Sequence, residues 1–138
     1  MNRIPKFLIN MVITVTLFSI AINVPSLWNQ YTTIKKVEEV MIKYAQKNAG
    51  FMPIYDKYGS VVMTADQKIN ELMTIYDLHD KIKNIKFVPG LNIPVQKRDK
   101  FEIIITPRIV IKIPFTGDKE FSAKPIRNYG YSHKYFKN

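Results

Sequence analysis

The sequence predicts an α+β protein with a long N-terminal helix, a second short helix and an antiparallel sheet of three or four strands. Three observations predict this class. An uncharged apolar run near the start passes into an amphipathic pattern with helical spacing. A shorter helical pattern follows over residues 64–80, and between residues 84 and 126 the apolar residues alternate as in strands. We therefore expect a membrane-spanning or filament-core helix over residues 1–28 and an α+β domain over residues 29–138.

The first segment has the length and composition of a membrane helix. Residues 7–34 carry no charged side chain, and the most apolar stretch is Phe7–Val24. As a helix this stretch is about 27 Å long, close to the hydrocarbon thickness of a bilayer. Trp28 and Tyr31 follow it, and such rings favour the headgroup zone.

The flanking charges predict the orientation of this helix. Arg3 and Lys6 precede the apolar run, so the positive-inside rule places the N-terminus in the cytoplasm and the domain outside. A cleaved secretory signal is the alternative, because Ser19 and Ala21 are small residues at the spacing that a signal peptidase reads. The apolar pattern continues past Ala21, which favours a retained helix. Both interpretations place the domain outside the cytoplasm.

The helix is expected to continue to about residue 50 with one apolar face. Pro25 marks a kink or the junction between the two parts, and Gly50 suits a left-handed cap at the end. The apolar stripe consists of Ile34, Val37, Met41 and Tyr44. The opposite, solvent-facing side is assigned to Lys35, Lys36, Glu38, Glu39, Lys43 and Lys47.

A second helix is predicted over residues 64–80. Residues 51–62 before it are interpreted as a loop or a short extended segment. Thr64 and Gln67 have the spacing of a capping box, which predicts the start of the helix. Its end is expected near His79 or Asp80. Its apolar stripe comprises Ile69, Leu72, Met73 and Tyr76.

The strand pattern predicts an antiparallel meander. A short strand is expected around residues 85–87, and the strongest signal covers Lys100–Phe115, interrupted by Pro107. A hairpin turn at residues 116–118 would lead into a returning strand over Glu120–Ile126. We expect the two helices to cover the apolar face of this sheet. That face comprises Phe101, Ile103, Ile105, Ile109, Ile111, Ile113 and Phe115.

Catalytic and metal-binding motifs are missing from the sequence. It contains no cysteine, which excludes disulfides, thiol nucleophiles and cysteine zinc sites. Its two histidines, His79 and His133, do not have ligand spacing, and neither a glycine-rich phosphate loop nor a GxSxG motif occurs. We therefore expect no enzyme activity, no metal and no cofactor.

The basic C-terminal end is a candidate polyanion contact. The chain has 21 basic and 11 acidic residues, a net charge of +10, and no acidic residue follows Phe121. Basic groups interleaved with aromatic rings suit single-stranded nucleic acid or another polyanion, such as a cell-wall polymer. The simpler interpretation is a last strand whose tyrosines pack on the sheet. The candidate residues are Lys124, Arg127, Tyr129, Tyr131, Lys134, Tyr135 and Lys137.

The order of these features resembles pilins and pseudopilins, and more closely the TadE-like proteins, within them a family carried by Gram-positive mobile and conjugative elements. Three segments carry the resemblance: residues 42–50 (IKYAQKNAG), similar to the family's RYAE-x-x-G; the segment FEIIITPRIVIKI; and residues 130–137 (GYSHKYFK), similar to G-x-S-x-x-YWK. Type IV pilins and TadE proteins also carry a glycine before the processing site and a glutamate shortly after it. This chain has no glycine in residues 1–6 and no glutamate in residues 7–34.

The resemblance implies a structural subunit of an extracellular filament or of a conjugation- or secretion-linked surface apparatus. Such a subunit would rest in the cell membrane and then self-associate at the cell surface through its N-terminal helix. The alternatives are a monomeric membrane-anchored accessory protein of such a channel and a DNA-contacting minor pilin. The residues expected to mediate helix–helix packing are Phe7, Leu8, Met11, Val12, Val15, Leu17 and Ile20.

Overall fold

The computed structural model describes residues 5–133 and confirms the α+β class. Lys134, Tyr135 and Lys137 of the predicted polyanion contact lie outside the described residues. The two helices are α1, Lys6–Lys47, and α2, Ala65–Ile75. The strands are β1 (Ile54–Tyr55), β2 (Val61–Met63), β3 (Ile82–Val88), β4 (Lys100–Pro107), β5 (Ile109–Ile113), β6 (Gly117–Phe121) and β7 (Ile126–Tyr131).

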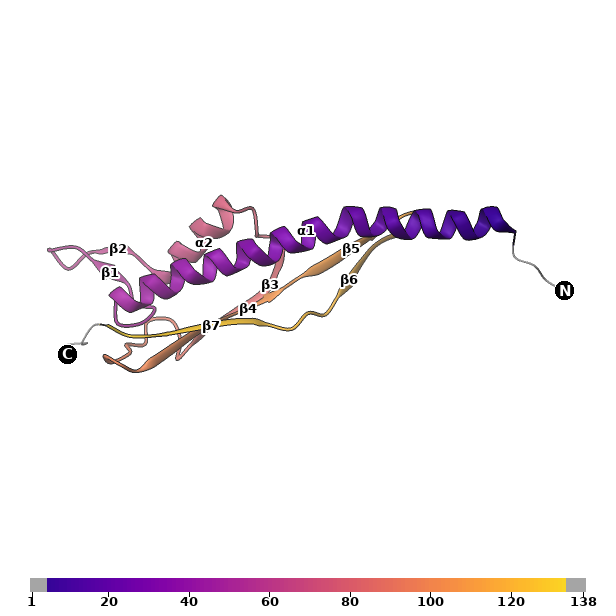
Figure 1. Ribbon diagram of the computed structural model, residues 1–138. Helices are drawn as coiled ribbons and strands as arrows, with labels where there is room; N and C mark the ends of the chain where they lie inside the picture. Colours follow the sequence, from indigo (N-terminus) through magenta and orange to yellow (C-terminus); the bar gives the residue numbers. More distant parts are fainter. Residues whose placement is uncertain (1–4, 134–138) are drawn as a thin grey trace.

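Helix α1 is a single rod of 42 residues, and its first part projects beyond the rest of the molecule (Figure 1). Pro25 lies inside it without ending it, so the predicted junction at this proline is not a break in the helix. The helix ends at Lys47, and Ala49 and Gly50 follow with φ of 56° and 104°. The N–H of Gly50 donates to the carbonyl oxygen of Ala45 at 2.9 Å, which closes the helix end, with Ala49 rather than the predicted Gly50 in the left-handed cap position.

Helix α2 begins as predicted and ends earlier than predicted. Its capping box is present: the N–H of Gln67 donates to Thr64 Oγ1 at 3.1 Å, and the N–H of Thr64 donates to Gln67 Oε1 at 3.0 Å. The helix stops at Ile75 instead of near residue 80, because Asp77 adopts a left-handed φ of 54°. The N–H of Leu78 then donates to the carbonyl oxygen of Met73, and the Leu78 side chain is buried against the core.

The sheet is not the predicted meander. The strand order of the main antiparallel sheet is β3-β4-β7, whereas β5 and β6 form a separate hairpin and β1 pairs with β2. The predicted turn at residues 116–118 and return strand over Glu120–Ile126 have the wrong bounds: the turn covers residues 114–116, the returning strand is β6, and residues 122–125 separate it from β7, which pairs with β4. The main sheet and the hairpin separate at Pro107, where a proline cannot donate a ladder hydrogen bond.

Helix α1 lies between α2 on one side and the main sheet on the other (Figure 1). The predicted alternation in β4 is confirmed, because Phe101, Ile103 and Ile105 are fully buried. The expectation that both helices cover the sheet is corrected: α1 contacts β4, β5 and β7, and α2 packs against α1. Phe115 also departs from its predicted place on the apolar face, since it is 98% exposed in the turn between β5 and β6.

Gly130 allows β7 to approach α1 closely. A Cβ atom at this position would lie 2.9 Å from Ile42 Cγ2 and 3.1 Å from Phe101 Cζ. Both distances are shorter than van der Waals contact, so a larger residue would force the strand away from the helix. The absence of a side chain at Gly130 therefore keeps the final strand against the core.

Candidate functional site

The first candidate site is the part of α1 that precedes its first buried residue, residues 6–22, which we call the free helix half. No residue of this segment is buried, although most of its side chains are apolar. Helix α1 is long and apolar enough to cross a membrane. Six of the predicted assembly residues are exposed here, namely Phe7, Leu8, Met11, Val12, Leu17 and Ile20, and Val15 is half-buried.

The free helix half ends where Asn23 binds the β5–β6 hairpin. Asn23 Nδ2 donates to the carbonyl oxygen of Lys112 at 2.9 Å, and the N–H of Lys112 donates to Asn23 Oδ1 at 2.9 Å. The side chain thus pairs with β5 as a neighbouring strand would. The buried residues of α1 therefore start at Asn23.

Gln30 makes a second attachment farther along the helix. Its Nε2 donates to the carbonyl oxygens of Lys81 and Arg108, both at 2.9 Å. No role was assigned to either amide from the sequence, and both lie in the uncharged run of residues 7–34. A signal was available, because positions 23 and 30 are seven residues apart and such positions share one helix face.

Glu38 also departs from its predicted position. It was placed on the solvent side of the helix, but its side chain is fully buried, and its carboxyl oxygens have no hydrogen-bond partner among residues 5–133. Ile34, Glu38 and Ile42 are spaced by four and share one face, which the sheet covers at Ile34 and Ile42. Burial raises the pKa of Glu38 to about 8, an effect that the cation of Lys35 partly offsets.

The second candidate site is the outer surface of the main sheet. Arg127, Tyr129 and Tyr131 alternate with the residues of β7 that face α1, so they share the outer side. The rings of Tyr129 and Tyr131 are 6.2 Å apart in an edge-to-face arrangement, and Lys100 Nζ lies 4.4 Å from the centre of the Tyr129 ring. The structure therefore brings together three of the predicted polyanion residues and adds Lys100 from β4.

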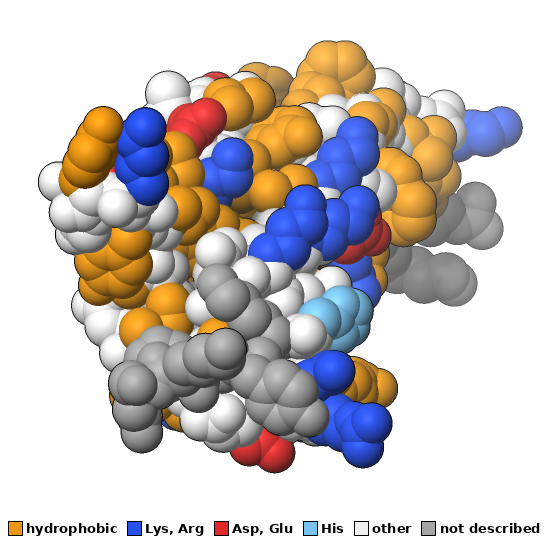
Figure 2. Space-filling view, turned by 90° about the vertical axis from the view of Figure 1, so that its left-hand side faces the viewer, with side chains coloured by type: hydrophobic (Ala, Val, Ile, Leu, Met, Phe, Trp, Pro, Cys, Tyr) orange, Lys and Arg blue, Asp and Glu red, His pale blue; other side chains and the backbone are white. Residues whose placement is uncertain are grey.

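Other features of this outer face are less favourable to an anion. Arg127 Nη1 lies 3.8 Å from Glu102 Oε1, which partly compensates its charge. Lys124 is exposed in the segment before β7, where it lines a hollow with Tyr31 and Lys35 instead of joining the two tyrosines. The opposite end of the molecule from the N-terminus also carries Lys and Arg side chains scattered among hydrophobic ones (Figure 2).

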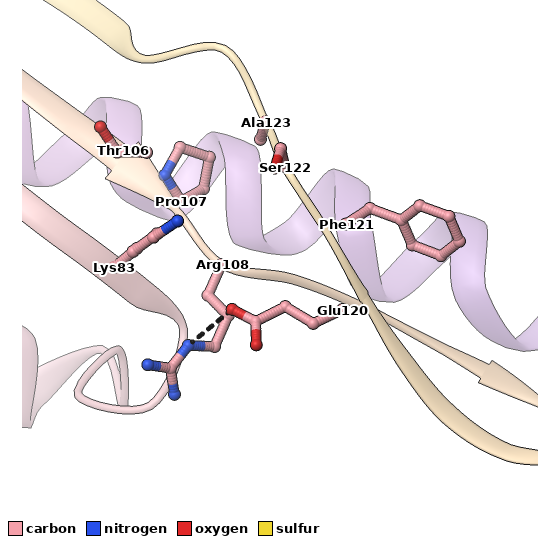
Figure 3. A pocket seen from close by; sticks show the side chains of 8 residues that line it. All are labelled: Lys83, Thr106, Pro107, Arg108, Glu120, Phe121, Ser122 and Ala123. Carbon is pink, nitrogen blue, oxygen red and sulfur yellow. Dashed lines mark ion pairs between the residues drawn. The ribbon is translucent and has the colours of Figure 1, made fainter.

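A third feature is a polar hollow of about 440 Å³ at the point where the hairpin leaves the main sheet (Figure 3). In this hollow Arg108 Nε and Glu120 Oε1 form an exposed ion pair at 3.2 Å, and Phe121 is directed away from that pair (Figure 3). Water screens such a pair, and no hydrogen bond joins a hydroxyl to a base among the eight lining residues. The residues of this hollow therefore do not indicate a catalytic site.

The described part of the chain contains no group of three or more His, Cys, Asp or Glu side chains placed to hold a metal ion. His79 instead lies 2.8 Å from Thr74 Oγ1 through its Nε2 atom, beside the end of α2. No family model, no curated protein and no solved structure matched the chain.

Proposed function

We propose that the protein is a pilin-like structural subunit that is held in a membrane by α1 and assembles at the cell surface through the free helix half. The observation that carries this proposal is the contrast between the two halves of one continuous helix. Residues 6–22 expose apolar side chains and bury none of them, whereas the second half of the helix buries one face against the α+β domain. Exposed apolar surface of this extent is unfavourable in water and requires lipid or other helices as cover.

A rigid helix that joins both halves suits a subunit that moves from a bilayer into an assembly. In the membrane, lipid chains cover the free helix half. In a filament, the same side chains of neighbouring subunits cover one another, and the sheet domains form the outer wall. The resemblance to the TadE-like proteins supports this function, and the missing glutamate indicates that the contact it makes in other filaments is not used.

The test is a pair of matched aspartate substitutions. Leu17 on the free helix half and Ile75 at the end of α2 are 61% and 63% exposed, so neither substitution disrupts the domain core. Leu17→Asp should abolish surface fibres that contain this chain, because it places a charge in the helix–helix contact. Ile75→Asp should leave the fibres intact. Normal fibres from the Leu17→Asp protein, seen by electron microscopy of sheared surface material, would contradict the proposal.

A polyanion contact on the outer sheet face is a second candidate function, and the gathering of Tyr129, Tyr131 and Lys100 on that face favours it. Aromatic stacking contributes about 1–3 kcal/mol per base in single-strand binding proteins. Replacing Tyr129 and Tyr131 with serine should therefore weaken binding of a fluorescent single-stranded oligonucleotide at least about tenfold. The control replaces the exposed Tyr55 and Tyr58 of the β1–β2 region. Equal affinity in both double variants would exclude this contact.

A further inference from the structure

The β5–β6 hairpin runs along α1 toward the free helix half. Gln30 binds the carbonyl oxygen of Arg108 just before β5, and Asn23 binds Lys112 near its end. Seven residues of helix cover about 10 Å and four residues of strand about 13 Å, so the two elements advance together. The turn that follows, residues 114–116, therefore lies closer to the N-terminus than Asn23. Figure 1 shows β5 and β6 converging on the helix there.

The length of helix beyond the turn is too short to cross a bilayer alone. The turn extends about two residues past Lys112, or about 7 Å, which places it near the level of Ser19. From Phe7 to Ser19 the helix measures about 20 Å, whereas the hydrocarbon core is about 30 Å thick. A helix that spans this core therefore brings the hairpin turn to the lipid surface or below it.

The chemistry of the turn fits that position. Residues 113–117 carry no charge, and Phe115 at their centre is 98% exposed. The N–H of Thr116 donates to the carbonyl oxygen of Ile113, and Pro114 has no N–H to satisfy. The first charged residue on each strand lies one residue farther from the tip: Lys112 on β5 pairs in register with Asp118 on β6. An apolar tip followed by charged residues is suited to the boundary between acyl chains and headgroups.

We infer that the β5–β6 turn inserts Phe115 into the outer leaflet beside α1, so that the domain contacts the bilayer at two points. This inference rests on the proposed membrane span of α1. The two hydrogen bonds of Asn23 fix the hairpin at a set depth relative to the helix. The second contact would also limit how far the domain tilts and would be released when the helix leaves the membrane for an assembly.

The test uses tryptophan fluorescence of the full chain in vesicles. Trp28 is the sole tryptophan of the sequence, so Trp28→Phe provides a silent background. Three conservative variants are then compared: Phe18→Trp in the free helix half, Phe115→Trp at the turn, and Phe121→Trp at the far end of β6, which pairs with Ile109. The vesicles contain phosphatidylcholine and phosphatidylglycerol, with bromine atoms on the acyl chains near the headgroups or deep in the bilayer.

We expect the Phe18→Trp and Phe115→Trp proteins to lose fluorescence to the brominated lipids and to emit at shorter wavelength. The Phe115→Trp protein should therefore be quenched together with the Phe18→Trp protein, and the Phe121→Trp protein should not respond. Quenching of the Phe18→Trp protein alone would overturn the inference and leave the membrane span intact. If the brominated lipids quench none of the three proteins, the proposed membrane span of α1 is refuted. A shift to shorter wavelength in the Phe115→Trp protein without bromine quenching would assign the turn to a contact with a neighbouring protein subunit. Quenching of all three proteins would show that the whole hairpin lies in lipid. Each of these two outcomes would contradict the inference.

Discussion

The Glu38 carboxyl group is buried in α1, and burial raises its pKa from 4.5 to about 8. Between these two values the folded state holds a proton that the unfolded chain releases. The contribution of Glu38 to the free energy of unfolding is therefore largest below pH 4.5 and falls as the pH rises toward 8, with a slope of at most about 1.4 kcal/mol per pH unit. The stabilisation falls over this range because the carboxyl group ionises in the unfolded chain, where water solvates it, but stays neutral in the folded chain, where its charge would be buried without a hydrogen-bond partner.

This reasoning predicts the effect of removing the titrating group. Glu38→Gln should be more stable than the natural chain at pH 8, and the difference should shrink toward pH 5. Urea unfolding across this pH range measures it. The neighbouring Glu39 is exposed, so Glu39→Gln should follow the natural chain at every pH. Parallel pH profiles of the Glu38→Gln variant and the natural chain would show that the carboxyl group is not protonated in the folded state.

At the scale of single elements, the β5–β6 hairpin is attached to the helix by few polar bonds. Asn23 donates to and accepts from the backbone of Lys112, and Gln30 binds the chain just before β5. Hydrogen bonds of this kind contribute about 0.5–1.5 kcal/mol each. The hairpin should therefore open locally at lower free energy than the main sheet, which is paired on both sides of β4.

Asn23→Leu should increase the amide exchange rate of Lys112 by about 10- to 100-fold, because the variant lacks both bonds to that residue. Asn10→Leu makes the same chemical change on the exposed free helix half and should have no effect there. Exchange of the β4 amides should be unchanged in both proteins. Unchanged exchange at Lys112 in the Asn23→Leu variant would show that apolar packing, rather than the amide, holds the hairpin.

For the whole molecule, the structure separates the residues on which the fold depends from the exposed apolar residues of the proposed membrane segment. No residue from 6 to 22 is buried, and the buried residues of α1 begin at Asn23. A chain that starts at Ile22 should therefore keep its fold, with a Tm within a few degrees of the full chain, and lose its affinity for vesicles. A chain that starts at Thr32 lacks Asn23 and Gln30 and should melt at a clearly lower temperature. Circular dichroism melts and vesicle sedimentation measure both effects. If the chain that starts at Ile22 does not fold, residues 6–21 are needed for the fold and this prediction is wrong.

Local sequence patterns determined which segments form helices and strands. The uncharged run and the spacing of Ile34, Val37 and Met41 predict the long helix, and Thr64 with Gln67 predicts the start of α2, because both patterns depend on residues within a few positions of each other. The alternation of Phe101, Ile103 and Ile105 likewise predicts the buried face of β4. The apolar character of the free helix half is evident from the same uncharged run of residues.

Tertiary structure decided how the elements meet. The pairing of β7 with β4, the position of α2 on the far side of α1 and the attachment of Lys112 to Asn23, 89 residues away in the chain, are long-range choices that no periodicity encodes. The burial of Glu38 follows from them: a helix covered on two sides has a wider buried surface than its single apolar stripe indicates. Local spacing shows which side chains share a face, but the elements packed against that face determine which of them lose contact with water.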